Sequence, residues 1–141
     1  MRKSFATLVL GVAVAGVTIA SSAALQAHHA FAAEFDARKE VTLKGSVSRV
    51  EWVNPHVWIH VDVKKPDGTI ESWAIEAGTP NVLFRRGVTK QSLKSGTEVV
   101  INGYQAKDGS RRANGRDVKL ADGSKLFLGG SGGTGAPYEI K

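Results

Sequence analysis

The sequence predicts a small all-β fold, an antiparallel barrel with one short helix, from three observations. Short runs rich in Val, Ile, Thr and Trp separate the turn signals, and such runs favour strands. No cysteine is present, so a single core has to form without disulfides. The turn signals recur at short intervals, at Asn54-Pro55, Pro66-Asp67-Gly68, Gly78 to Pro80, Ser95-Gly96, Asp108-Gly109, Asn114-Gly115 and Asp122-Gly123. This spacing suits a small barrel, and a small open β-sandwich is the alternative.

A long first strand is predicted over residues 41–53. Its apolar residues begin in one alternating phase, as at Leu43, but Val50 and Trp52 fall in the other phase. A bulge or bend over residues 45–49 reconciles the two phases. Trp52 is then expected in the core or at one end of the barrel.

The second strand shows the clearest alternation. One set of its residues is apolar and predicts the core face: Val57, Ile59, Val61 and Val63. The intervening set is polar and aromatic and predicts the outer face: His56, Trp58, His60 and Asp62. Any ligand-binding surface of this strand is therefore expected on the second set.

The remaining elements complete the expected topology. Strands are predicted near residues 70–77, 98–107, 116–120 and 125–128, and a short helical or looped piece over residues 80–86. The best hairpin signals are Asp67-Gly68 and Asp122-Gly123. A long bent first strand, a meander, a short helix and closing strands follow the order of an oligonucleotide- and oligosaccharide-binding barrel.

The amino terminus has the pattern of a secretory signal peptide. Arg2 and Lys3 precede an uncharged apolar run over residues 5–19, which is shorter than the roughly 20 residues that span a bilayer. Small residues follow, and cleavage after Ala27 or after Ala24 fits a signal peptidase. The sequence therefore predicts export from the cytoplasm and no stable membrane insertion after cleavage.

Four segments follow from these boundaries: a signal peptide (1–27), an amino-terminal arm (28–40), a β-barrel domain (41–128) and a flexible Gly-rich tail (129–141). Removing 27 of the 141 residues leaves 114 and lowers the formal net charge from +6 to +4. The remaining basic residues are scattered rather than gathered into a stripe, so nucleic acid is not an expected partner. The oligomeric state stays open.

Several segments together resemble a known family. They are HHAFAAEFD, VTLKGSVSRVEWVNPHVWIHVDV, Arg85-Arg86-Gly87 and GYQAKDGS. In these the chain resembles an exported proteobacterial family that is known only as a domain of unknown function. The resemblance implies a periplasmic location and supports a barrel-like fold, but it implies no reaction, ligand or catalytic residue.

Enzymatic signatures are weak in this sequence. No serine stands in a strand-turn-helix nucleophile elbow, and no Gly-rich phosphate loop precedes a helix. A carboxylate pair of a hydrolase has to come from the acidic residues on the predicted strands, Glu51, Asp62, Glu71 and Glu76. Solvated strand residues are the much better explanation for these carboxylates, so we expect no enzyme and assign no catalytic residue.

The outer face of the second strand is the expected ligand site. Trp58 lies between His56 and His60, and an aromatic ring there can stack on a ring-shaped or sugar-like ligand. Trp73 on the next strand extends this candidate site, because strands two and three form the binding face of such barrels. The alternative is that Trp58 packs under the arm around Phe31 and Phe35. We expect a noncatalytic binding or accessory module whose partner is a small ligand or a periplasmic protein.

The histidines suggest a metal site as a second hypothesis. All 4 lie in two short places, at residues 28–29 and at His56 and His60. Residues four apart on a strand stand about 13 Å apart, so His56 and His60 cannot share one metal. Cleavage after Ala27 would give His28 a free α-amine beside its imidazole, and nitrogen donors suit copper or zinc. The candidate ligands are therefore His28, His29 and His56.

Overall fold

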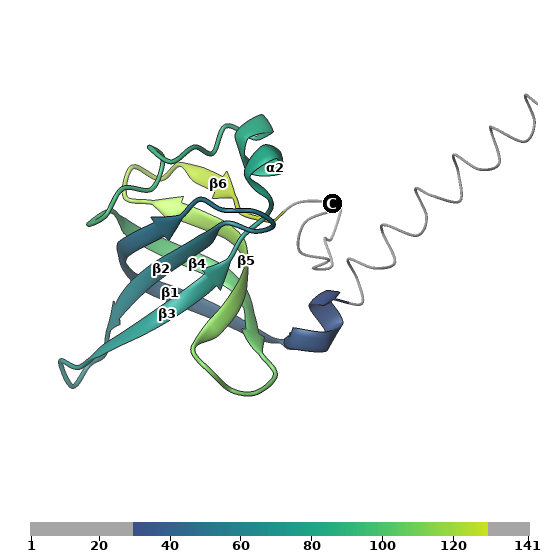
Figure 1. The fold of residues 1–141 in the computed structure, drawn as a ribbon. Coiled ribbons are helices and arrows are strands. Elements are labelled where there is room, and N and C mark those ends of the chain that lie inside the picture. Colours follow the sequence, from purple (N-terminus) through teal and green to yellow (C-terminus); the bar gives the residue numbers. More distant parts are fainter. Residues whose placement is uncertain (1–29, 130–141) are drawn as a thin grey trace, which may run out of the picture.

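The computed structural model describes residues 30–129. Figure 1 shows its elements, which are β1 (Phe35–Glu51), β2 (Trp58–Lys64), β3 (Ile70–Glu76), α2 (Pro80–Arg85), β4 (Glu98–Ala106), β5 (Arg112–Leu120) and β6 (Lys125–Phe127). A helical turn over residues 30–34 leads into β1. The predicted signal peptide, His28, His29 and residues 130–141 of the predicted tail lie outside the described residues.

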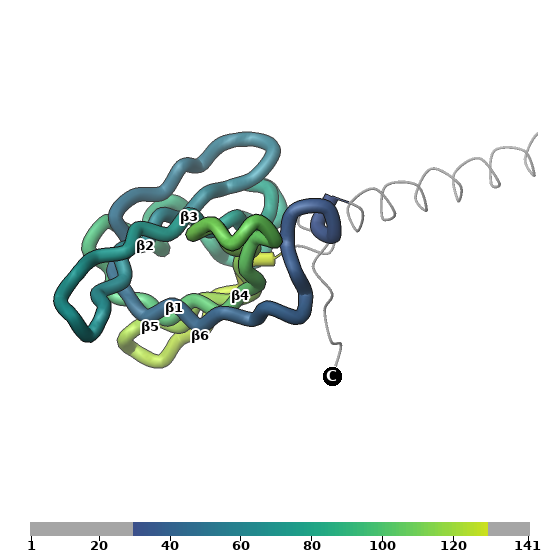
Figure 2. Tube along the Cα trace, turned by 90° about the horizontal axis from the view of Figure 1, so that it is seen from below, coloured from purple at the N-terminus to yellow at the C-terminus, as the bar shows by residue number. Residues whose placement is uncertain are grey.

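Backbone pairing closes the sheet into a ring. The strand order is β3-β2-β1-β4-β5-β6, and β3 also pairs with β5. That closing pair is parallel and joins residues 74–76 to residues 112–114, whereas the other strand pairs are antiparallel. Figure 2 views the ring end-on. A five-stranded ring of this connectivity is the oligonucleotide- and oligosaccharide-binding barrel, so the barrel prediction is confirmed and the open sandwich is set aside.

The first strand contains the predicted bulge. The pairing of β1 with β2 shifts register between Val47 and Arg49, inside the segment where the two apolar phases conflict. Trp52, just after β1, packs partly buried against the core. A Cβ on Gly45 would lie 2.2 Å from the carbonyl oxygen of Asp62, so the close approach of β1 and β2 requires a glycine there.

Two boundaries differ from the sequence prediction. β1 begins at Phe35, within the predicted arm, and not at residue 41. β5 begins at Arg112, so Asn114-Gly115 lies inside a strand and is not a turn. A Cβ on Gly115 would lie 2.8 Å from a methyl carbon of Ile75. This glycine therefore permits close packing where β3 and β5 close the ring. A turn signal based on glycine does not tell a glycine needed for close packing from a glycine in a turn.

The two predicted hairpins are confirmed. β2 and β3 pair across the turn at Gly68, and β5 and β6 pair across the turn at Gly123. Both glycines have positive φ, 86° and 85°, a conformation that side chains with a Cβ rarely adopt.

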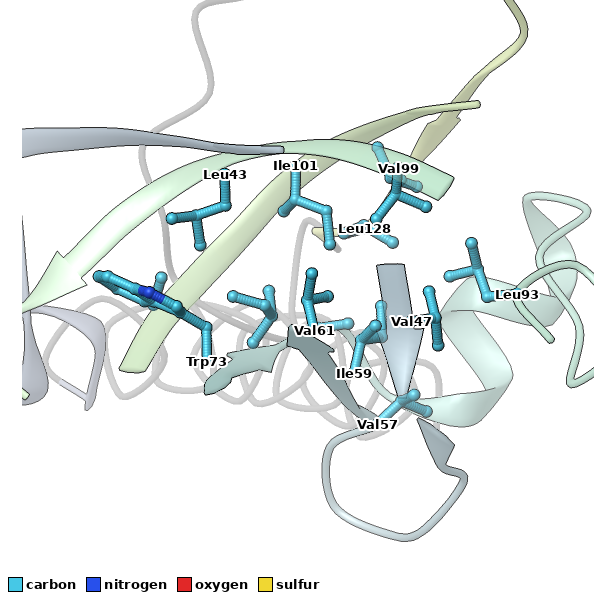
Figure 3. Packing of buried hydrophobic residues seen from close by; sticks show 14 of the residues in the cluster. Leu43, Val47, Val57, Ile59, Val61, Trp73, Leu93, Val99, Ile101 and Leu128 are labelled. Atoms are coloured by element: carbon cyan, nitrogen blue, oxygen red, sulfur yellow. The ribbon is translucent and has the colours of Figure 1, made fainter. Parts of the chain in front are cut away.

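The core fills the ring and continues under the helix. The buried residues of β2 are Ile59 and Val61, and Val57 just before the strand is buried too, as the alternation predicts. Figure 3 shows these side chains converging with those of the other strands. α2 begins after Thr79, whose hydroxyl accepts a hydrogen bond from the Val82 amide, and it buries Leu83. Within residues 30–129, no helix has the length and apolar character needed to cross a membrane.

Candidate functional site

The outer face of β2 carries the residues that the sequence predicts for a ligand site. Trp58 and His60 are half-buried and alternate with the buried Ile59 and Val61. The register places Trp58 between Glu51 of β1 and Glu76 of β3. A single row of outward-facing residues therefore has a carboxylate on each side of the tryptophan.

The first of these carboxylates belongs to an exposed cluster. Glu51 accepts a hydrogen bond from Arg49 at 2.7 Å and contacts the Nε2 atom of His60 at 3.0 Å. Hydrogen bonding from Arg49, followed by the nearby His60, lowers the pKa of Glu51 below its ordinary value. The Glu51 side chain is 43% exposed, so this cluster is available to a partner in solution.

The second carboxylate belongs to a buried pair. His56 lies just before β2, after the cis peptide bond between Asn54 and Pro55. Its Nδ1 atom contacts Oε1 of Glu76, the last residue of β3. The two side chains are 23% and 12% exposed. Hydrogen bonds of Val57 with the backbone beyond β3 continue the ladder and hold the pair together.

Burial dominates the acidity of Glu76. It raises the pKa of this carboxyl above its ordinary value, and the nearby charge of His56 opposes the rise. The carboxylate of Glu34 adds to the rise, which places Glu34 in the same electrostatic environment. The Asn114 side chain approaches Glu76 closely enough to favour the ionised form. Glu76 is therefore surrounded by polar groups although it is nearly buried.

One residue with unpartnered buried polar atoms, Asn114, lies beside this pair. Among the described residues, buried side-chain atoms without a hydrogen-bond partner are Ser110 Oγ, Arg112 Nε and both amide atoms of Asn114. Asn114 is fully buried and lies directly opposite Glu76 where β3 and β5 close the ring. Buried polar atoms in native proteins almost always have partners.

The amino-terminal arm lies over the same part of the barrel. Phe31 contacts Phe35 and the edge of Tyr104, at ring-centre distances of 5.8 Å and 5.6 Å. Glu34 accepts a hydrogen bond from Arg112 at 2.6 Å. Figures 1 and 2 both show the helical turn beside the loop that leads into β5. Phe31 and Phe35 form a buried cluster with Tyr104 and Ala106, and the alternative that Trp58 packs under this arm stays a prediction.

A family model decides the affiliation of the chain. The model of DUF6152, a family of unknown function, matches residues 15–115. The chain belongs to this family. The resemblance to a domain of unknown function that the sequence motifs indicate is thereby confirmed.

Two further comparisons concern this DUF6152 chain. None of the curated proteins matches it. A similar solved structure is the mitochondrial single-stranded DNA-binding protein Rim1 of S. cerevisiae, with 14% identity and a TM-score of 0.44 over 59% of this chain and 94% of that one. The expectation that nucleic acid is not a partner stays a prediction.

Trp73 does not join the outer face. Its side chain is 8% exposed and belongs to the core. It pairs with Val61 and points into the barrel alongside Leu43 in Figure 3. This corrects the placement of Trp73 in the predicted ligand site. The signal was present in the sequence, since Trp73 is in phase with the apolar Ile75.

The four acidic strand residues of the DUF6152 chain do not face one another. Each has a basic or hydroxyl partner: Glu51 with Arg49, Asp62 with Ser72, Glu71 with Lys65 and Arg111, and Glu76 with His56. The carboxylate that influences Glu76 is Glu34, which is not among the four acidic residues on the predicted strands. Enzyme activity remains unassigned.

Only one of the three candidate metal ligands, His56, lies among the described residues. Within residues 30–129, no three His, Cys, Asp or Glu side chains converge on a point that would hold a metal ion. His56 has Glu76 beside it, and His60 has Glu51, but the two histidines have no common partner. His28 and His29 lie outside the described residues, so the proposed set of His28, His29 and His56 stays a prediction.

The outer face of β2 continues into an open groove of about 780 Å³. Asp62 and Lys64 of β2 contribute to its lining together with Lys44, Glu98 and Lys119. The groove therefore offers acidic and basic side chains on neighbouring strands. It begins on β2 two residues beyond His60, on the face that carries Trp58.

Proposed function

We propose that this DUF6152 protein is an exported, noncatalytic binding module that holds its ligand on the outer face of β2. One observation carries the proposal: Trp58 and His60 share an outward row, and that row leads into the groove at Asp62 and Lys64. Barrels of this architecture commonly bind their ligands on the surface of strands two and three. The signal-peptide pattern supports a periplasmic location.

The side chains indicate a polar, ring-shaped ligand of the sugar class. Trp58 supplies an aromatic surface for stacking. The cluster of Arg49, Glu51 and His60 supplies donors and an acceptor beside it. The groove adds lysines and carboxylates. The lysines can donate hydrogen bonds to sugar hydroxyl groups, and the carboxylates can accept hydrogen bonds from them. A periplasmic protein is the alternative partner, and it would use the same exposed row.

The test uses soluble peptidoglycan disaccharides, the sugar class of the periplasm, with the isotopically labelled mature protein. Binding should shift the amide signals of residues 58–64 and the indole signal of Trp58 in NMR spectra. Trp58→Ala should weaken binding by about tenfold or more, and Trp58→Phe by less, because it keeps an aromatic ring. A short oligonucleotide is the comparison ligand.

The matched control is Phe84→Ala, which removes an exposed aromatic ring on α2 and should leave sugar binding unchanged. Shifts that avoid β2, or equal weakening by Trp58→Ala and Phe84→Ala, would show that the face is wrong. Preferential binding of the oligonucleotide would replace the sugar by a nucleic acid.

A further inference from the structure

We propose that residues 77–97, which comprise α2 and its connection to β4, dock this protein on an anionic lipid surface. We call this segment the basic cap. Its exposed basic side chains meet the lipid headgroups, and the ring of Phe84 enters the boundary between headgroups and acyl chains. The cap contributes no residue to the Trp58 row or to the groove, so the inference does not rest on the proposed sugar site.

All charged side chains of the basic cap are positive. They are Arg85, Arg86, Lys90 and Lys94, and the segment contains no aspartate or glutamate. All four are exposed. Among residues 30–129 none of the four has an ion-pair partner, whereas strand residues such as Arg112 have one. Lys and Arg side chains near an anionic leaflet each strengthen binding by about fivefold.

Buried apolar residues hold the basic cap on the barrel. Leu83, Val88 and Leu93 recur at every fifth position and all belong to the core. The basic residues lie between these anchors or directly after the last one, so each exposed stretch carries at least one cation. The amides of Arg86 and Val88 both donate hydrogen bonds to the carbonyl oxygen of Leu83. The exposed side chains therefore project from a backbone that packing and hydrogen bonds fix in place.

Phe84 supplies the apolar part of the cap. It is the most exposed large apolar side chain among the described residues, at 69%. It lies on α2 between the buried Leu83 and the exposed Arg85. An exposed ring beside basic side chains is the composition of segments that bind at membrane interfaces, where the ring enters the headgroup boundary and the cations meet anionic lipids.

The position of the cap suits a flat partner. Figure 1 shows α2 at the upper end of the barrel and the hairpin that joins β2 to β3 at the lower end. A barrel that rests on its upper end keeps its sides accessible. Long basic side chains without fixed partners suit the diffuse charge of a lipid surface, whereas the carboxylates of an acidic protein would need matched positions. The predicted signal peptide also delivers the protein next to a membrane.

The test measures binding of the purified mature protein to lipid vesicles by co-sedimentation, after intact mass has shown that the apolar signal peptide is absent. The vesicles contain phosphatidylcholine alone or an equal mixture of phosphatidylcholine and phosphatidylglycerol. The wild type should bind only the anionic vesicles. Raising the salt concentration to about 0.5 M should weaken this binding, because salt screens the attraction between exposed charges.

Two variants remove the two parts of the cap separately. The double variant Arg85→Gln/Lys90→Gln should weaken binding to the anionic vesicles by about tenfold or more, because it removes two cations. Phe84→Ala should weaken binding by about fivefold or more, because no ring then leaves water. Arg86 stays unchanged in both variants, since its guanidinium lies over the ring of Phe127 at 4.6 Å and its loss would also remove a packing contact.

The matched controls lie away from the cap. Arg38→Gln/Lys39→Gln removes two exposed cations near the start of β1, and Ile70→Ala removes an exposed apolar side chain at the hairpin between β2 and β3. Both should bind the anionic vesicles as the wild type does. Sugar binding should persist in Phe84→Ala, so the two proposals can fail separately.

Three results would each overturn the lipid proposal. The first is an absence of binding to the anionic vesicles. The second is equal weakening by the control variants, which would show attraction by net charge alone. The third is stronger retention on immobilised polyglutamate than on the vesicles, which would replace the lipid surface by an acidic protein.

Discussion

The two His–Glu pairs of this barrel use the same residue types for opposite electrostatic results. At the exposed pair, Arg49 and His60 lower the pKa of Glu51. At the buried pair, loss of solvent raises the pKa of Glu76 despite His56 beside it. The two histidines are about equally exposed, at 23% and 21%, whereas the Glu76 side chain is 12% exposed and the Glu51 side chain 43%. The burial of the carboxylate therefore decides in which direction the pKa of a His–Glu pair's glutamate shifts.

The largest expected effect is on the free energy of unfolding, which should differ between variants of the two His–Glu pairs. His56→Ala leaves the nearly buried Glu76 without its counter-charge and should lower the free energy of unfolding by about 2–3 kcal/mol. His60→Ala removes a contact to the exposed Glu51 and should cost less than about 1 kcal/mol. Urea denaturation of both variants in metal-free buffer measures the difference. Equal losses would mean that the two environments are energetically alike.

A somewhat smaller effect tests what makes the second pair buried. Phe31→Ala removes a ring that packs on Phe35 and Tyr104 and should cost about 2 kcal/mol. It should also loosen the arm that carries Glu34, so the pKa of Glu76 should fall toward its ordinary value. NMR titration of the Glu76 carboxyl follows this change. An unaltered titration would show that the arm does not set the environment of Glu76.

The smallest effect is a difference of sign in pH dependence. The lowered pKa of Glu51 contributes stability above its ordinary value of 4.5, and this contribution is lost as the pH falls. The raised pKa of Glu76 has the opposite consequence, because stability is lost as the pH rises from 4.5 through the folded-state pKa.

Unfolding midpoints of Glu51→Gln and Glu76→Gln, measured from pH 3 to 7 in metal-free buffer, check these signs. The advantage of the wild type over Glu51→Gln should shrink toward low pH. Its advantage over Glu76→Gln should shrink toward high pH. Parallel profiles would contradict the opposite pKa shifts.

Local patterns explain which parts of the fold the sequence predicts. Alternation predicts the two faces of β2 correctly. Ile59 and Val61 are in phase, and successive residues of a strand point to opposite faces of the sheet. The conflict between Leu43 and Val50 located the bulge for the same reason. The prediction for Trp73 is wrong because it follows from the strands that usually bind ligands in such barrels and not from the phase that Trp73 shares with the buried Ile75.

The buried pair illustrates what the sequence does not reveal. When residues are paired outward from the hairpin at Gly68, Trp58 pairs with Glu76. The sequence is therefore sufficient to predict that Glu76 lies next to β2. The positions of Asn114 and Arg112 cannot be predicted in this way, because they depend on the parallel pairing of β3 with β5. Asn114-Gly115 has the composition of a turn, and only tertiary packing places it inside a strand.

The hydrogen bond between Glu34 and Arg112 joins the start of the chain to a strand that is synthesised much later. Its two residues are 78 apart in sequence, and every chain is synthesised from its amino end. The arm therefore exists long before the strands that receive it, and Phe31 and Phe35 stay uncovered until Tyr104 and Ala106 of β4 have emerged. A chain interrupted before Tyr104 would keep these rings exposed, and exposed apolar side chains of incomplete chains are what chaperones recognise.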